Sequence, residues 1–345
     1  MIGFNPLFFV GLAVLFCIIL WSYWEEWRVT KDRPPEGRLI KTKFGSLHLI
    51  ERGEKEEVAG SGNRGIRPLV MIHGSTTNAL DMDIELVGRL EEGRSLFLPD
   101  RPGHGFSDRP KDGWRLDVQA AAIREALREA GVEDPIILGQ SYGGAIALRY
   151  ALDYGDEISG LVLVAPVTHR WPGGVAWYNR IAINPLYGWL FRRSFIALYS
   201  RYGAKRGALR ALRGAAFASR YFDRTRVAMT FRPSKFYNNA EDIVRLYEQL
   251  VAMDTRYHEI PVPTEIVTGT HDMTVITSVH GRALAKQIPN AALKVINGGG
   301  HALHHTHPEE TVAAIMRLED RIASAQRSPL QGALKRLSAV FPSPS

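Results

Sequence analysis

The chain has 345 residues, of which 45% are hydrophobic and 23% are charged, and its formal net charge is +7. This composition excludes a disordered or fibrous protein, and the length suits one large domain or two small ones with a sizeable core. The single cysteine, Cys17, excludes an intramolecular disulfide.

The N-terminal segment is strongly apolar. Residues 1–24 contain no charged side chain, and a helix over residues 4–24 is long enough to cross a bilayer. Aromatic residues of the kind that anchor helices at a membrane interface gather at its end: Trp21, Tyr23, Trp24 and Trp27. We predict a single-pass transmembrane anchor over residues 1–27, joined to the body by a polar linker over residues 28–37.

The alternative is a cleaved signal peptide. No basic segment precedes the apolar run, and no small-x-small cleavage site lies before the tryptophans, so we favour the anchor. Basic residues follow the span, which by the positive-inside rule favours a body on the cytoplasmic side: Arg28, Lys31 and Arg33.

Beyond the linker, strand-like and helix-like runs alternate. Residues 38–43 and 46–52 are typical of a hairpin around Gly45, and residues 116–130 have the spacing of a helix. Six further runs are short and apolar, as buried strands are: 68–72, 95–99, 135–138, 161–165, 265–268 and 293–296. Unbroken apolar strands separated by helices predict an α/β fold with a mostly parallel sheet that is covered on both faces.

The sequence GSGNRG at residues 60–65 matches the dinucleotide-binding pattern GxGxxG by letter. A binding loop of that kind follows a strand and opens a helix. Here no strand precedes the glycines and a strand follows them, so we predict a surface loop without a cofactor.

The alternation stops over residues 169–260, which are mostly helical, aromatic and basic. We predict that this segment is an insertion between two parts of the sheet domain, residues 38–168 and 261–324. The tail, residues 325–345, has apolar residues at the spacing of an amphipathic helix that could lie on a lipid surface, and a disordered tail is the alternative: Leu330, Leu334, Leu337 and Phe341.

Three residues with complementary chemistry follow predicted strands. Ser141 lies in GQSYGG, where Gly139 and Gly143 complete the GxSxG pattern that exposes a serine hydroxyl on a sharp strand-to-helix turn. Asp272 follows the strand at 265–268, and His301 follows the strand at 293–296. Because the carboxyl ends of parallel strands meet at one edge of a sheet, we expect the three to lie together.

These residue types divide one chemical task. His301 would accept the proton of Ser141, and Asp272 would hold the imidazole in the required tautomer. The developing oxyanion needs two donors, for which we predict the backbone N–H groups of Tyr142 and Ser75. The alternatives are a helix cap for Ser141, a loop cap for Asp272 and a non-catalytic His301.

The chain resembles a capped α/β-hydrolase over residues 38 to about 322. The resemblance rests on the sequences VMIHGS, LPDRPGHGFSDRP, ILGQSYGGAIAL, VTGTHDMTV and GGGHALHH, which occur in the family's order. It implies a helical cap inserted after the sixth strand. Position 140 is Gln where His is frequent, and the nucleophile is Ser rather than the Asp of epoxide hydrolases and haloalkane dehalogenases, which disfavours those two activities.

The resemblance implies a serine hydrolase that cleaves an ester or related acyl bond and needs neither a cofactor nor a metal. A cofactor-free haloperoxidase or a carbon–carbon bond hydrolase would use the same three residues. A weakly active ligand-binding or scaffold protein of the same fold is the alternative from another class. The sequence does not predict the oligomeric state.

We predict substrate contacts from Trp171 and Trp177 in the cap and from His304 beyond the last strand. The histidines at 304, 305 and 307 do not predict a metal site, because cysteines and clustered carboxylates are missing. The residues from 168 to 260 contain sixteen Lys or Arg and six Asp or Glu, a net charge of +10. No nucleic-acid motif accompanies this charge, so we favour anionic lipid over nucleic acid as its counterpart, with a solvated helical face as the alternative. Together with the anchor, these features predict an apolar, lipid-like acyl substrate.

Overall fold

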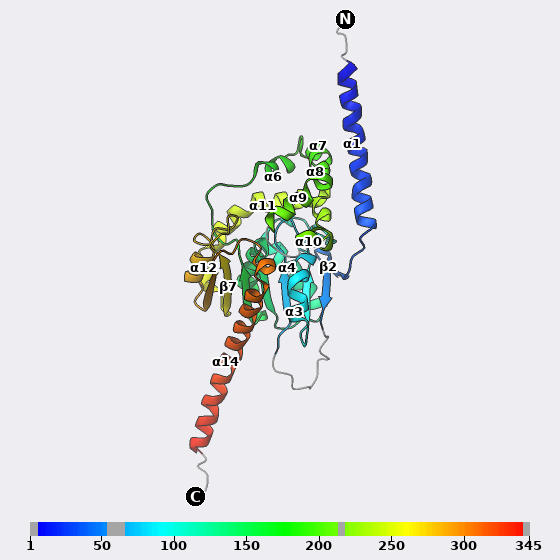
Figure 1. Cartoon of the computed structure of the whole chain (residues 1–345). Coiled ribbons are helices and arrows are strands. Elements are labelled where there is room, and N and C mark those ends of the chain that lie inside the picture. The colour runs from blue at the N-terminus through cyan, green and yellow to red at the C-terminus, as the bar shows by residue number, and fades with distance from the viewer. Residues whose placement is uncertain (1–5, 54–65, 213–217, 341–345) are drawn as a thin grey trace.

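The computed structural model describes residues 6–53, 66–212 and 218–340. The GSGNRG sequence at 60–65, predicted to be a surface loop, lies outside the described residues. Figure 1 shows a central body from which two long helices project, one near each end of the chain.

An eight-stranded sheet forms the centre of the body, in the order β1-β2-β4-β3-β5-β6-β7-β8. The strands β1 and β2 form the predicted hairpin at one edge, β2 pairs antiparallel with β4, and all the other pairs are parallel. The strands are β1 (Arg38–Thr42), β2 (Gly45–Arg52), β3 (Leu69–Ile72), β4 (Leu96–Pro99), β5 (Ile136–Gln140), β6 (Gly160–Val164), β7 (Thr264–Gly269) and β8 (Ala291–Ile296). The mostly parallel sheet predicted from the sequence is confirmed.

Helices cover both faces of this sheet, as its apolar strands require. One face packs against α4 (Leu116–Glu129), α5 (Tyr142–Tyr154) and α12 (Gly281–Gln287). The other packs against the short segments α2 (Leu80–Met82), η1 (Asp83–Val87) and α3 (Gly88–Leu90), and against the first part of α14 (Pro308–Val340). Each face therefore has its own hydrophobic core, and the strand ends between them hold the loops that carry polar groups.

A helical cap lies between β6 and β7, so the predicted insertion after the sixth strand is confirmed. The cap has a small hydrophobic cluster of its own, which includes Ile196, Phe231 and Phe236. Its segments are α6 (Trp177–Ala182), α7 (Gly188–Phe191), η3 (Arg192–Ile196), α8 (Ala197–Tyr202), α9 (Ala204–Ala211), α10 (Ala218–Arg224), η4 (Val227–Phe231), α11 (Pro233–Met253) and η5 (Tyr257–Glu259).

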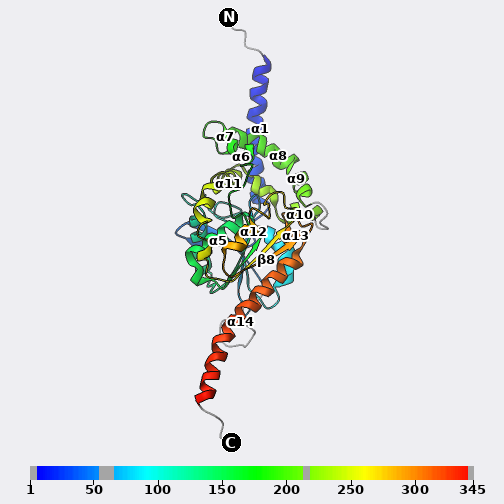
Figure 2. The same cartoon turned by 90° about the vertical axis from the view of Figure 1, so that its left-hand side faces the viewer.

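The helix α1 (Pro6–Lys31) projects from the cap end of the body with its apolar side chains exposed (Figures 1 and 2). It is the one described helix that is long and apolar enough to cross a membrane, and a signal sequence would have the same length and composition. The helix α14 leaves the body at the opposite end and continues without a break into the tail, as far as Val340. That this part of α14 is amphipathic and could lie on a lipid surface stays a prediction.

The last turns of α1 are attached to the cap. The carboxylate of Glu26 lies 2.7 Å from the guanidinium of Arg193, which also lies 3.6 Å from the centre of the Tyr23 ring. Arg232 donates to the hydroxyl of Thr30 at 3.0 Å. Two of the basic residues of the cap, Arg193 and Arg232, therefore bind the C-terminal end of α1.

Candidate active site

Ser141 occupies a strained turn between β5 and α5. Its backbone has φ 53° and ψ −115°, a conformation that residues other than glycine rarely adopt. The two flanking glycines make the turn possible, since a Cβ on Gly139 would lie 2.4 Å from the Gly143 carbonyl oxygen and one on Gly143 would lie 2.2 Å from that of Ile72. The hydroxyl thus projects beyond the end of the sheet, as the GxSxG pattern predicts.

The three predicted strand-end residues form a hydrogen-bonded series. The Oγ of Ser141 lies 3.0 Å from Nε2 of His301, and Nδ1 of His301 lies 2.8 Å from Oδ2 of Asp272. The other oxygen of Asp272 accepts the backbone N–H groups of Thr274 and Val275, each at 2.8 Å. Because Asp272 is buried and fixed by these amides, its free oxygen orients the imidazole so that Nε2 faces the serine.

The loop after β3 lies beside the serine and carries Ser75. The next amide, that of Thr76, donates to the side chain of Asn239 at 2.7 Å, so it is not free to bind an oxyanion. A Cβ on Gly74 would lie 2.3 Å from the Gln140 side chain and 3.3 Å from Cβ of Ser141, so only glycine lets this loop approach the serine so closely. Tyr142 begins α5, whose N-terminal backbone amides carry partial positive charge.

A cavity of about 690 Å³ lies between the cap and the sheet, and both Ser141 and His301 line it. Its volume is within the range of sites for small organic molecules. Its apolar lining comes mainly from the cap: Trp177, Tyr178, Phe195, Ile196, Tyr199, Leu212, Tyr221, Val227, Phe231 and Phe236.

The three residues predicted to contact substrate lie in different places. Trp177 and His304 line the cavity. Trp171 is not among the residues that line the cavity: its indole N–H donates to the carbonyl of Gly174, and its ring packs against Tyr247 and His280, so a contact with substrate stays a prediction for it. The cap chain leaves the sheet at this point, so Trp171 covers the core instead of the cavity.

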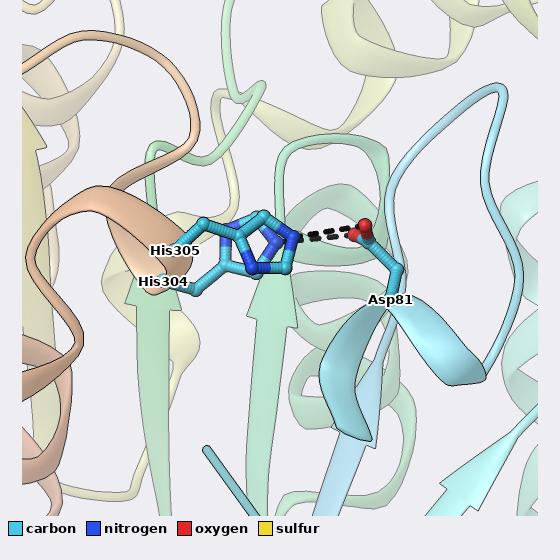
Figure 3. Close-up of side chains that lie close together, drawn as sticks. All are labelled: Asp81, His304 and His305. Carbon is cyan, nitrogen blue, oxygen red and sulfur yellow. Dashed lines mark hydrogen bonds and ion pairs between the residues drawn. The ribbon is translucent and has the colours of Figure 1, made fainter. Parts of the chain in front are cut away.

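His304 takes part in a buried polar cluster at the wall of the cavity (Figure 3). The imidazoles of His304 and His305, on α13 (Leu303–Thr306), both point at the carboxylate of Asp81 on α2, with Nε2–oxygen distances of 3.1 and 3.0 Å. Tyr221 of the cap donates its hydroxyl to the same carboxylate. The cluster joins three segments of the chain around one negative charge.

The electrostatics of the cluster fit an ionised carboxylate held by the two imidazoles. Burial opposes charge on Asp81, but the neighbouring imidazoles outweigh it and hold the pKa of this carboxyl well below its usual value. Burial, and then the neighbouring His305, lower the pKa of His304 to about 4.

The same three side chains offer possible metal ligands, with donor atoms within 4.8 Å of one another. Each Nε2, however, faces a different oxygen of the Asp81 carboxylate. This is the arrangement expected when two imidazole N–H groups donate to one carboxylate. We therefore interpret the cluster as a hydrogen-bonded link between α2 and α13, and we derive no metal chemistry from it.

Two residues of α11 contribute to the site and were not identified from the sequence. Asn239 holds the loop of Ser75, as described above. Asp242 is buried and forms ion pairs with Arg101 at 3.1 Å and with Arg109 at 2.8 Å, and it lies 2.9 Å from Nε2 of His104. The guanidinium of Arg101 lies 4.4 Å from the centre of the Tyr142 ring, so this cluster ties the cap to the turn that carries the serine.

The fold and the site together define a capped hydrolase of the α/β class. Residues 67–308 match the family described as the alpha/beta hydrolase fold, and the chain belongs to this family. Membership establishes a hydrolase fold with this core, and it leaves the substrate to be argued from the site.

Several named proteins are similar to this chain. Lipase 3 of Moraxella sp. (strain TA144) is 27% identical over 266 residues, which cover 73% of this chain and 77% of the lipase. Haloalkane dehalogenase 2 of Mycobacterium tuberculosis is 22% identical over 290 residues, which cover 82% of this chain and 94% of that protein. Among solved structures, the bromoperoxidase from Bacillus anthracis has a TM-score of 0.62 at 20% identity, covering 81% of this chain and 98% of its own. The esterase RhEst1 from Rhodococcus sp. ECU1013 has a TM-score of 0.60 at 22% identity, and the match covers 84% of this chain and 99% of the esterase. At these identities the solved structures support the fold alone.

Proposed function

We propose that this protein is a membrane-anchored serine hydrolase that cleaves an ester or related acyl bond of an apolar substrate through an acyl-enzyme intermediate. The observation that carries the proposal is the hydrogen-bonded series Ser141–His301–Asp272 at the wall of a largely apolar cavity. The series joins a nucleophile, a base and an orienting carboxylate within hydrogen-bond reach.

In the first step, Nε2 of His301 takes the proton of Ser141 while Oγ bonds to the carbonyl carbon of the substrate. The former carbonyl oxygen becomes an oxyanion, which the backbone N–H groups of Tyr142 and Ser75 would bind. Asp272 remains ionised and stabilises the imidazolium through Nδ1–H.

The tetrahedral intermediate then collapses. The bond to the leaving alcohol breaks, the alcohol oxygen takes the proton from Nε2, and the acyl group stays on Oγ as an ester. A water molecule next gives its proton to Nε2 and attacks the acyl carbon. Loss of Ser141 Oγ, which regains the proton, releases a carboxylic acid and restores the enzyme.

The lining of the cavity supports an apolar acyl group. Phe231 and Phe236 are buried in the cap beside the cavity, and Trp177 and Phe195 line it while remaining 61% and 52% exposed. We infer that the cavity opens beside these two exposed aromatic side chains, where an apolar chain can enter.

The position of α1 supports delivery from a membrane. Its exposed apolar side chains would face lipid, and the contacts of Glu26 and Thr30 hold the cap against its last turns. A hydrolase fixed in this way keeps the opening of its cavity close to the bilayer, which favours substrates that partition into lipid.

The test is ester hydrolysis by the full chain in lipid nanodiscs. Wild-type protein should prefer long-chain over short-chain acyl esters, Ser141→Ala should abolish turnover, and Asp272→Asn should reduce kcat by about 10⁴-fold. Unchanged turnover by Ser141→Ala would refute the mechanism, and a preference for short, soluble esters would refute the proposed substrate class.

A further inference from the structure

One stretch of the cap is unusually apolar for a surface. Residues 181–191 contain no charged side chain and cover the end of α6, the connection that follows and all of α7. Leu186 is 89% exposed, and Tyr187 and Trp189 are exposed by 51% and 47%. A contiguous run of large exposed apolar side chains marks an interaction surface rather than an ordinary protein–water boundary.

This stretch lies at the level of the apolar part of α1. In both views, α7 lies at the end of the body that reaches farthest toward the N-terminal end of α1 (Figures 1 and 2). The helix α7 continues directly into η3, which packs against α1. Arg193 on η3 pairs with Glu26 on α1. Each belongs to the first charged pair after the apolar run of its element, Arg192-Arg193 after residues 181–191 and Glu25-Glu26 after residues 1–24.

The apolar run of α1 and the apolar run of residues 181–191 therefore end at the same level of the molecule. On α1 the boundary is marked by Tyr23, Trp24 and Trp27, which are the residue types that settle at the lipid–water interface. On the cap it is marked by Arg193, whose guanidinium lies over the Tyr23 ring. Arg193 is held by Glu26 and Tyr23 inside the molecule, so it marks the level of the interface, and the apolar residues above that level meet acyl chains.

From this coincidence we infer that residues 181–191 insert into the bilayer beside α1 and form a second, shallow membrane attachment of the cap. The inference rests on the proposed function in one respect, namely that α1 spans a bilayer. A helix rises about 1.5 Å per residue, so Gly188 lies at most about 8 Å beyond Arg193, within the roughly 5–10 Å depth of interfacial segments.

The insertion has a consequence for the path of the substrate. Trp177 and Phe195, which line the cavity and are exposed, flank the inserted stretch on either side in the sequence. The opening of the cavity then faces the acyl-chain region directly. A lipid-like substrate reaches Ser141 by moving sideways out of the membrane, without crossing water.

The experiment measures depth with a fluorescent label on the full chain in nanodiscs. The natural Cys17 is the only cysteine and lies on α1, so it provides a site for the anchor itself. In a Cys17→Ser background, Leu186→Cys places an NBD label on the inserted stretch. Met316→Cys on α14, where the side chain is 60% exposed, is the matched control at the other end of the body. For each protein, the NBD fluorescence is measured with two quenchers: lipids that carry a nitroxide on the upper acyl chain, and iodide in the water.

We expect the label at position 186 to emit at shorter wavelength in nanodiscs, to be quenched by the nitroxide lipid and to be protected from iodide. The label at position 316 should show the opposite. Iodide quenching at position 186 equal to that at position 316 overturns the insertion. Protection at position 186 from both quenchers also overturns it, because a protein contact would then cover the stretch.

The label on Cys17 separates failure of this inference from failure of the proposed function. Lipid quenching at Cys17 without lipid quenching at position 186 refutes the insertion alone. Iodide quenching at Cys17 refutes the membrane anchor, and with it the basis of the insertion.

Discussion

Asn239 is the residue through which the cap acts on the proposed chemistry. Its Oδ1 accepts the N–H of Thr76 at 2.7 Å and its Nδ2 donates to the Thr76 hydroxyl at 3.1 Å. Thr76 has φ 60°, an unfavourable left-handed conformation that needs such support. Asn239 is thus a positioning residue for the amide of Ser75.

Replacing Asn239 should therefore impair turnover more than binding. We expect Asn239→Ala to lower kcat by about tenfold to a hundredfold, somewhat less than direct loss of an oxyanion donor, with little change in KM. The neighbouring variant Asn238→Ala is the control, because that side chain donates to the carbonyl of Gly103, outside the site. Steady-state ester hydrolysis measures both, and equal kcat values for the two variants would argue against this role.

His73 should make the stability of the protein sensitive to acid. Burial, followed by the neighbouring Arg101, lowers the pKa of His73 to about 4, below its usual value of 6.5. The unfolded chain therefore binds a proton that the folded chain rejects as the pH falls from 6.5 to 4, and stability is lost over that window. The neutral ring accepts the N–H of Arg101 at Nε2 and lies 2.9 Å from the carbonyl oxygen of Gly74 at Nδ1, and protonation would break the first of these bonds.

By linkage, one such histidine costs up to roughly 2 kcal/mol of unfolding free energy between pH 8 and pH 5. The pKa of His280 and that of His304 are also lowered to about 4, chiefly by burial, so the total effect should be larger. Urea unfolding at pH 8 and pH 5 tests this, and His73→Gln should show a smaller dependence on pH. Equal midpoints at the two pH values in the wild-type protein would contradict the prediction.

The residues of the proposed chemistry could be located from the sequence, whereas their supports could not. Ser141, Asp272 and His301 each follow an apolar strand and stand beside glycines, so local patterns reveal them. Asn239 and Asp81 act only through contacts between segments far apart in the chain, which no local pattern shows. The sole hint was the Asn238-Asn239 pair, since asparagine is unfavourable inside a helix unless its side chain has a specific partner.

Among the elements, α13 is linked to α2 through a single carboxylate. Its two imidazoles hold Asp81, and it begins two residues after His301. We expect Asp81→Asn to destabilise the fold by roughly 3–5 kcal/mol, because the buried negative charge is lost and an NH2 donor replaces one of the two oxygens that face the imidazoles. Thermal unfolding measures the change, and a melting temperature equal to that of the wild type would refute the structural role.

A chelator tests the hydrogen-bonded interpretation of the same cluster. If Asp81 is held by two imidazole N–H groups, dialysis against EDTA should change neither the melting temperature nor the rate of ester hydrolysis. A loss of either that added Zn²⁺ restores would show instead that these residues bind a metal.

The elements of the sheet were predictable because their strands are unbroken apolar runs. Every predicted strand is present, with ends shifted by one or two residues, as in β5 (Ile136–Gln140) and β8 (Ala291–Ile296). The cap was predictable only as a helical insertion. The number of its short helices, and the position of Trp171 outside the cavity, depend on how the cap packs on the sheet and on α1, and a pattern of apolar residues does not contain that information.

At the scale of the whole molecule, Glu26 couples α1, the proposed anchor, to the cap. Its carboxylate pairs with Arg193 at 2.7 Å and accepts the hydroxyl of Ser234 at 3.1 Å. Glu25 is the matched control, because it pairs with Arg28 at 2.6 Å on the same helix. We expect Glu26→Gln in nanodiscs to lower kcat/KM for long-chain esters by about threefold to tenfold, the effect of roughly 1 kcal/mol, and Glu25→Gln to leave it unchanged.

Short-chain, soluble esters complete the comparison. They do not need a path from the membrane, so Glu26→Gln should leave their hydrolysis unaltered. Equal losses on long and short esters would mean that Glu26 supports the fold of the cap rather than the coupling of the cap to the anchor.

The central claim is that Ser141 is the nucleophile of a serine hydrolase. The most direct measurement is intact-protein and peptide mass spectrometry after reaction with a fluorophosphonate, which modifies a serine only when a neighbouring base activates it. We predict one adduct per chain, located on Ser141, and none on the folded Ser141→Ala variant. An unlabelled wild-type protein, or an adduct that persists in Ser141→Ala, would contradict the claim.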